Sequence, residues 1–168
     1  FYFFDWLRIR LRVPIDWRYW YWPSPPEAGR IVFGPASNSE FHFRVTPLKR
    51  PATAQAGGAE KSLEEIRRFQ AARGDSISPV KKLCTPNTCV YYSDFADSKY
   101  DNANPHSMPY ARLGFAQIGD VMLRIELLYR ESSKDAAERM TSAVSWTKIL
   151  DLAAARKAAT QSGSKSAE

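Results

Sequence analysis

The stretch from Leu7 to Trp20 reads LRIRLRVPIDWRYW, and its pattern decides the fold class. Apolar residues occupy every odd position from Leu7 to Tyr19. The even positions include four arginines, which are Arg8, Arg10, Arg12 and Arg18. A period of two residues predicts a β-strand with one apolar face and one basic face, and it does not fit a helix. Because Pro14 has no amide donor, the strand either lies at a sheet edge or breaks in two near this residue.

Further segments of the chain also carry strand patterns. Short strands are expected over residues 30–34, 40–48 and 88–95. A hairpin is expected farther along, with its turn at Ile118-Gly119-Asp120 and its return strand over Val121–Arg130. One face of that return strand is apolar and consists of Leu123, Ile125, Leu127 and Tyr129. The sequence therefore predicts a mainly β chain.

Two segments change to a helical pattern. Ser62 is a suitable N-cap with Glu65 three residues on, so a short helix is expected over residues 63–73, ended by Gly74. A second helical stretch opens at Lys134, and its stripe consists of Met140, Val144, Thr147, Leu150 and Ala154. We therefore expect a β-sandwich domain over residues 1–132 and a helical tail over residues 133–168 that frays at its end.

The composition is that of one globular domain with a basic balance. The 168 residues carry a formal net charge of +6, and the sequence pI is about 9.4. Such a balance favours polyanionic partners such as nucleic acid or an anionic membrane surface, although many basic proteins bind neither. The sequence contains no apolar run of about 18 residues, which a transmembrane helix requires.

The two cysteines, Cys84 and Cys89, flank the tetrapeptide TPNT. Their number and spacing fit neither a zinc site nor the C-x-x-C of a redox centre. We expect two buried or semi-buried thiols of an intracellular fold. The alternative is a small disulfide loop in an oxidising compartment.

The basic face of the first strand is the candidate nucleic-acid-binding site. Alternate side chains on a strand lie about 6.6 Å apart. This distance is close to the phosphate step of an extended single strand, so Arg8, Arg10 and Arg12 are each placed to meet one phosphate. Arg18 completes the candidate set. The alternative is that these arginines pair with acidic residues on a neighbouring strand or protect an edge against aggregation.

Aromatic residues follow the arginines along the same stretch. The candidates for stacking on bases, or for an interface between subunits, are Trp17, Tyr19, Trp20 and Trp22. The alternative places these side chains in the core. No catalytic or metal-ligand motif accompanies them: G-x-S-x-G, H-E-x-x-H and glycine-rich phosphate loops are all missing from the sequence. We therefore expect no enzyme, no metal site and no cofactor.

Four segments resemble the capsid proteins of circular single-stranded DNA (circovirus-like) viruses. The first, FFDWLRIRLRVPIDWRYWYWPSP, is similar to an early capsid strand of basic alternation that ends at proline. The others are SLEEIRRFQAARGDSISPVKKLCTP, DNANPHSMPYARLGFA and GDVMLRIELLYRES, which resemble a helix-containing segment, a loop and the last strand. The likeness covers about Phe3 to Glu131. The arginine-rich arm of that family is missing from this sequence, and the helical stretch from Lys134 has no counterpart in it.

The resemblance implies an antiparallel β-sandwich of the single jelly-roll type, with one short helix in a loop. It also implies a structural protein of a virion that self-assembles in many copies into an icosahedral shell. The partners would be other copies of the chain and packaged nucleic acid, which is expected to be single-stranded. No small-molecule substrate is expected.

The alternative function is a non-catalytic accessory subunit of a large membrane-associated or organellar complex. In that hypothesis the Trp and Tyr side chains lie at the headgroup level and the arginines meet anionic lipids. A membrane surface is a partner only under this alternative, which places the protein in an organellar or intracellular complex.

Overall fold

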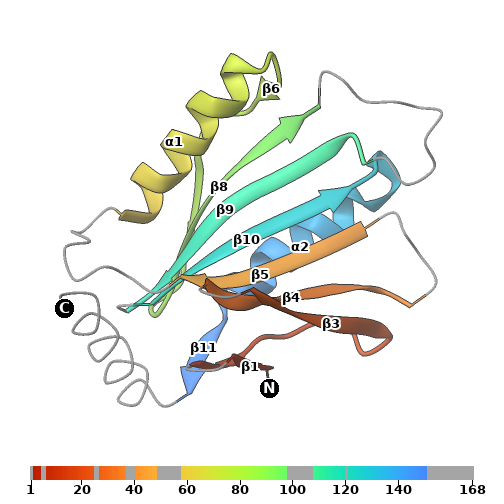
Figure 1. Ribbon diagram of the computed structural model, residues 1–168, viewed down its shortest axis with the longest axis vertical. Helices are drawn as coiled ribbons and strands as arrows, with labels where there is room; N and C mark the ends of the chain where they lie inside the picture. The colour runs from red at the N-terminus through yellow and green to blue at the C-terminus, as the bar shows by residue number, and fades with distance from the viewer. Residues whose placement is uncertain are drawn as a thin grey trace.

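In a computed structural model the chain forms an eight-stranded sheet, a three-stranded sheet and two α-helices over its described residues (Figure 1). The described residues are 2–4, 7–24, 27–36, 41–48, 58–97, 108–119 and 121–150. Every strand pair in them is antiparallel.

The large sheet joins the two halves of the chain. Its spatial order is β3 (Trp17–Ser24), β4 (Glu27–Pro35), β5 (Phe41–Leu48), β10 (Val121–Tyr129), β9 (Tyr110–Ile118), β8 (Cys89–Ala96) and β6 (Ser76–Ile77). A further strand, β7 (Lys81–Cys84), also pairs with β8. The whole of β5 pairs with β10, although the two strands are far apart in sequence. Strand β3 forms one edge of this sheet.

The small sheet has the order β1 (Tyr2–Phe4), β2 (Leu7–Arg10) and β11 (Lys148–Leu150). The apolar side chains of the opening stretch are buried as far as Leu11, and beyond it Ile15 is fully exposed. The reason is the break predicted at Pro14: β2 ends before it, and β3 begins at Trp17, whose amide donates to the Pro14 carbonyl over 3.2 Å. The break sends the chain from the small sheet to the edge of the large one.

The two helices cover opposite faces of the large sheet. Helix α1 (Gly58–Ala72) buries Ala59 and Leu63 against Phe115 of β9. Helix α2 (Lys134–Ser145), which follows a 3₁₀ turn at Glu131–Ser133, packs against the other face together with the small sheet. The main core lies on that side and includes Ile9, Phe33, Phe43, Ile125, Leu127, Met140 and Val144.

The mainly β, antiparallel fold with a short helix and a C-terminal helix is confirmed as a two-sheet sandwich. The predicted hairpin is present as β9 and β10, and Gly119 takes a positive φ of 56° at its turn. The apolar face of β10 is buried as expected. The strands divide eight to three between the two sheets.

Both helices differ from the predicted boundaries. Helix α1 begins at Gly58, four residues before the expected cap at Ser62, because burial of Ala59 against the sheet outweighs the local capping signal. It ends as predicted before Gly74, which has a φ of 88°. Helix α2 stops at Ser145, since the chain then turns into β11 and pairs with β2.

The division at residues 132 and 133 stays a prediction. Within the described part of the second segment, Met140, Val144 and Ile149 share one core cluster with the strands. The predicted frayed end, residues 153–168, lies outside the described residues.

Candidate docking surface

The described helices leave part of one face of the large sheet uncovered. Helix α1 packs over β8 and β9, and the side chains of β3, β4 and β5 on the same face point outward. We call this surface the open face and define it by Trp20, Trp22, Arg30, Val32, His42 and Arg44. Its residues line a shallow depression of about 280 Å³. Trp20 is 46% exposed and Trp22 is 55% exposed.

The strand register brings these side chains together. Trp22 lies opposite Arg30, and Trp20 lies opposite Val32 on the neighbouring strand. Val32 in turn lies opposite Arg44 on the next strand. Directly opposed residues of antiparallel strands point to the same face, so the alternation of WRYWYW places both tryptophans beside the arginines.

The open face is positively charged. The Arg30 guanidinium lies 5.3 Å from the centre of the Trp22 ring. Arg44 and the adjacent Arg124 both interact with Glu126, at 3.8 Å and 2.5 Å. Arg44 and Arg124 therefore share the Glu126 carboxylate, and Arg30 adds a further positive charge to the open face.

His42 adds no charge to the open face at neutral pH. Its partial burial, together with the charge of Arg44, lowers its pKa below the ordinary value of 6.5. The imidazole is therefore neutral at pH 7, and the arginines alone supply the positive charge of this face.

The predicted aromatic set is divided between two faces of β3. Trp20 and Trp22 lie together on the open face. Tyr19 points to the opposite face and is exposed, with its ring 6.5 Å from that of Phe33. Trp17 is partly buried and packs on the ring of Phe41 at 5.0 Å, so it belongs to the core as the alternative interpretation had it.

The predicted arginine set is divided in the same way. Arg8 and Arg10 lie on β2, and Arg12 follows it; all three are exposed and form one row outside the small sheet. Arg18 lies on β3 in the large sheet and is also exposed. The structure therefore brings together three of the four candidates.

A buried ion network on the helix α2 side was not predicted. The Arg112 side chain is 1% exposed, and its guanidinium donates to Asp94 (2.6 Å), to both carboxylate oxygens of Glu138 (2.6 and 3.0 Å) and to the Thr141 hydroxyl (2.9 Å). It also lies 4.7 Å from the centre of the Tyr92 ring. The only signal in the sequence was a lone charged residue inside the mostly apolar strand YARLGFAQI.

The network holds its acids ionised. Burial raises the pKa of Asp94, but hydrogen bonds from Arg112 and Lys81 outweigh it, and the pKa is lowered overall. The hydrogen bond from Arg112 likewise lowers the pKa of Glu138. Burial raises the pKa of nearby Tyr129 to about 12, so its phenol stays protonated at pH 7. None of these three groups titrates near neutrality. Their arrangement therefore suits a structural role, in which the ion pairs hold β8, β9 and α2 together.

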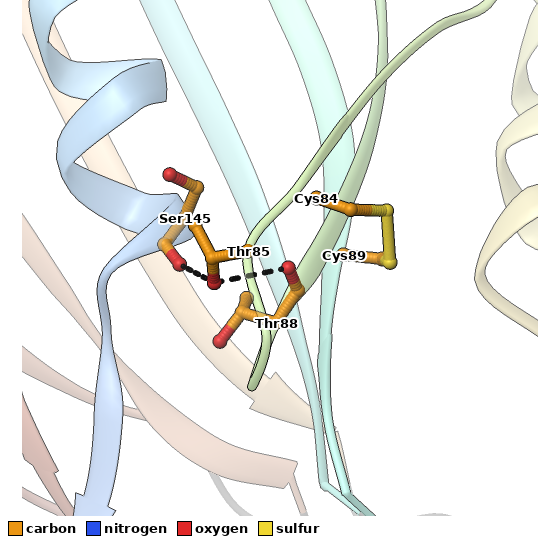
Figure 2. The surroundings of a disulfide bond; sticks show 5 residues. All are labelled: Cys84, Thr85, Thr88, Cys89 and Ser145. Atoms are coloured by element: carbon orange, nitrogen blue, oxygen red, sulfur yellow. Dashed lines mark hydrogen bonds between the residues drawn. A yellow bond between two sulfur atoms is a disulfide. The ribbon is translucent and has the colours of Figure 1, made fainter.

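The two cysteines form a disulfide, so the expectation of free thiols is wrong (Figure 2). Cys84 and Cys89 are opposed in the β7–β8 register, one step from the hydrogen-bonded pair Thr85–Thr88 that closes the turn. Opposed residues at such non-hydrogen-bonded positions lie closest across a ladder, which brings the sulfurs within bonding reach. The tetrapeptide TPNT is therefore the tip of a hairpin.

The described residues contain neither a metal-ligand cluster nor a membrane-spanning helix. Within the described ranges, no group of three or more His, Cys, Asp or Glu side chains is arranged to hold a metal ion. No helix in the described part of the chain is long and apolar enough to cross a membrane.

The fold resembles that of a solved protein. The solution structure of cyanobacterial PsbP (CyanoP) from Synechocystis sp. PCC 6803 superposes with a TM-score of 0.60. The identity is 12%, and the match covers 84% of this chain and 86% of that one. No family model and no curated protein matches the sequence. At this identity the likeness concerns the fold.

The capsid interpretation is wrong. The fold matches PsbP over most of both chains, and no family model supports a circovirus-like capsid. The predictions of a many-copy shell, a virion and packaged nucleic acid are therefore wrong as well. The patterns that suggested a capsid were basic alternating strands ended by proline, and any antiparallel sheet protein with a charged outer face can contain them.

Replacing Arg112 should cost much of the stability. Arg112→Met leaves Asp94 partly buried without its main partner, and we expect the free energy of unfolding to fall by about 3 kcal/mol. Glu138→Gln should cost less than about 1 kcal/mol, because the Glu138 side chain is 52% exposed. Urea unfolding at pH 7 measures both changes.

A pH series provides the control for that comparison. Because the pKa values of Asp94 and Glu138 are lowered by folding, their contribution is present above about pH 5 and lost as the pH falls through 4 and below. In Arg112→Met the free energy of unfolding should depend less on pH over this acid range. An unchanged pH dependence, or equal losses of stability in the two variants, would contradict the role of the network.

The disulfide should raise stability measurably. Joining Cys84 to Cys89 closes a loop of about six residues, and the Cys84→Ala/Cys89→Ala variant should lose about 2 kcal/mol. Reductant should lower the Tm of the wild type and leave that of the variant unchanged. Free thiols in the unreduced protein, detected by alkylation and mass measurement, would contradict the bond.

Proposed function

We propose that this protein is a non-catalytic accessory subunit that docks on a large membrane-associated or organellar complex through its open face. The observation that carries the proposal is the exposure of Trp20 and Trp22 beside Arg30 and Arg44, on a sheet face that α1 leaves uncovered. The arginine excess there favours an acidic partner surface.

Interface chemistry supports this use of the open face. Tryptophan and arginine are the residues that most often dominate binding energy at protein interfaces. A half-exposed tryptophan has apolar area to bury on docking. Arg30, held against Trp22, is already ordered, so less side-chain entropy is lost when a carboxylate binds it.

Two further observations support an accessory subunit over a capsid. The fold likeness to cyanobacterial PsbP fits the accessory hypothesis better than the viral one. The Cys84–Cys89 disulfide fits an oxidising compartment, such as the lumen of an organelle, better than a reducing cytosol. The described carboxylate cluster around Arg112 is occupied in structural ion pairs, which supports a non-catalytic role.

The proposal is tested in the cells that make the protein. After mild detergent extraction, the tagged wild type should migrate in a native gradient with an assembly many times its own mass of 19.1 kDa. Trp20→Ala/Trp22→Ala should shift it to the position of the free protein, because losing two such anchors weakens binding by about 30-fold or more.

Phe69→Ala is the matched control. Phe69 is 64% exposed on α1, away from the open face, and its removal should leave the assembly intact. A wild type that migrates alone, or a control that dissociates as fully as the double variant, would contradict docking through the open face.

A further inference from the structure

The depression in the open face contains a group that can change its charge between pH 5 and 8. Among the described residues that line it, that group is His42. We infer that the docking partner places a carboxylate in this depression and that His42 takes up a proton as the carboxylate binds. The inference rests on the docking role proposed above and adds to it that docking is tighter in acid than at neutral pH.

The rings of His42 and Trp20 border the same part of the depression. A Cβ atom added to Gly34 would lie 3.8 Å from an atom of each ring. The glycine therefore lies between the imidazole and the indole, and no side chain of its own separates them. A side chain of the partner that enters here contacts an apolar ring on one side and a titratable ring on the other.

The described charged groups around His42 are mostly positive. They come from β3, β5 and β10 and are Arg18 across Gly34, Arg44 on the same strand, and Glu126 and Arg130 on either side of the opposed Leu128. Glu126 is the one carboxylate in this set, and Arg124 holds it at 2.5 Å. The surroundings therefore disfavour a charged imidazole until a partner brings in another acid.

Two arginines of the depression are placed to receive that acid. The Arg30 guanidinium is held by the Trp22 ring and not by an acid of the described chain. Arg44 lies 3.8 Å from Glu126, and its side chain is 31% exposed. Because Arg44 lies opposite Val32, it is the diagonal neighbour of Arg30, about 7 Å away, a separation that long side chains span. One carboxylate can therefore accept hydrogen bonds from both guanidinium groups.

Proton uptake follows from the change that docking makes around the imidazole. In the free protein, burial and the charge of Arg44 lower the pKa of His42 below 6.5. A carboxylate within about 4–6 Å favours the imidazolium and raises this pKa. Docking should therefore strengthen as the pH falls through the pKa of the bound imidazole, and level off below the pKa of the free one.

Rebinding at two pH values tests the inference in the full chain. Purified tagged wild type is titrated into a detergent extract of producing cells that lack their own copy, at pH 7.5 and 5.5 and constant ionic strength. A pKa difference of one unit makes the half-saturation concentration about tenfold lower at pH 5.5. In His42→Gln the ratio of the two concentrations should fall to near one. His106→Gln removes the other histidine of the sequence and should keep the wild-type ratio.

The outcomes separate this inference from the docking role. Equal half-saturation concentrations at the two pH values, or a pH effect that persists in His42→Gln, overturn the inference and leave docking through the open face intact. A wild type that rebinds at neither pH overturns both.

A measurement on the wild type decides if His42→Gln fails to fold. The pKa of the His42 imidazole is followed by NMR with and without poly-L-glutamate, and the spectrum of His106→Gln assigns the signal. This pKa should rise by about one unit when poly-L-glutamate is added. An unchanged pKa overturns the inference.

Discussion

The guanidinium of Arg112 is the group on which the arrangement of the molecule depends. A charge with 1% exposure is tolerated only where it is paired, and its partners come from β8 and from helix α2. The network therefore fixes the position of α2 on the large sheet. Because α2 leads directly into β11, it also fixes where the small sheet forms.

The two basic surfaces follow from that arrangement. With α2 and the small sheet on one face and α1 over part of the other, the described elements leave the β3–β4–β5 region of the large sheet uncovered. The row of Arg8, Arg10 and Arg12 faces outward because Leu7, Ile9 and Leu11 fill the core beneath it. The two-residue period of the opening stretch thus places the arginines, and the break at Pro14 separates them from the tryptophans.

Local patterns were sufficient to predict part of the fold. The β9–β10 hairpin, the helix end at Gly74 and the break near Pro14 all depend on residues close together in sequence. Strand β11 was missed because Lys148–Leu150 continues the predicted helical stripe, and only its pairing with β2 makes it a strand. The buried role of Arg112 was missed for a similar reason, since its partners Asp94 and Glu138 lie 18 and 26 residues away.

The sequence predicted which types of residue the candidate site contains, but not which residues lie next to one another. Alternation correctly indicated that Arg8, Arg10 and Arg12 form one outward row, but a single strand cannot reveal that Lys148 lies opposite Arg10. Likewise Trp20 and Trp22 were candidates, whereas Arg30 and Arg44 join them only through the register of β3, β4 and β5. The false capsid resemblance came from the same limitation, because short alternating segments carry no information on strand order.

Site-specific photocrosslinking tests the central claim, docking through the open face, most directly. A photoreactive phenylalanine analogue at position 22 is compared in the producing cells with the same analogue at position 69, which is also exposed but lies on α1. We expect one discrete crosslinked product of a partner protein from position 22 and none from position 69. No product from position 22, or the same product from both positions, would contradict docking through the open face.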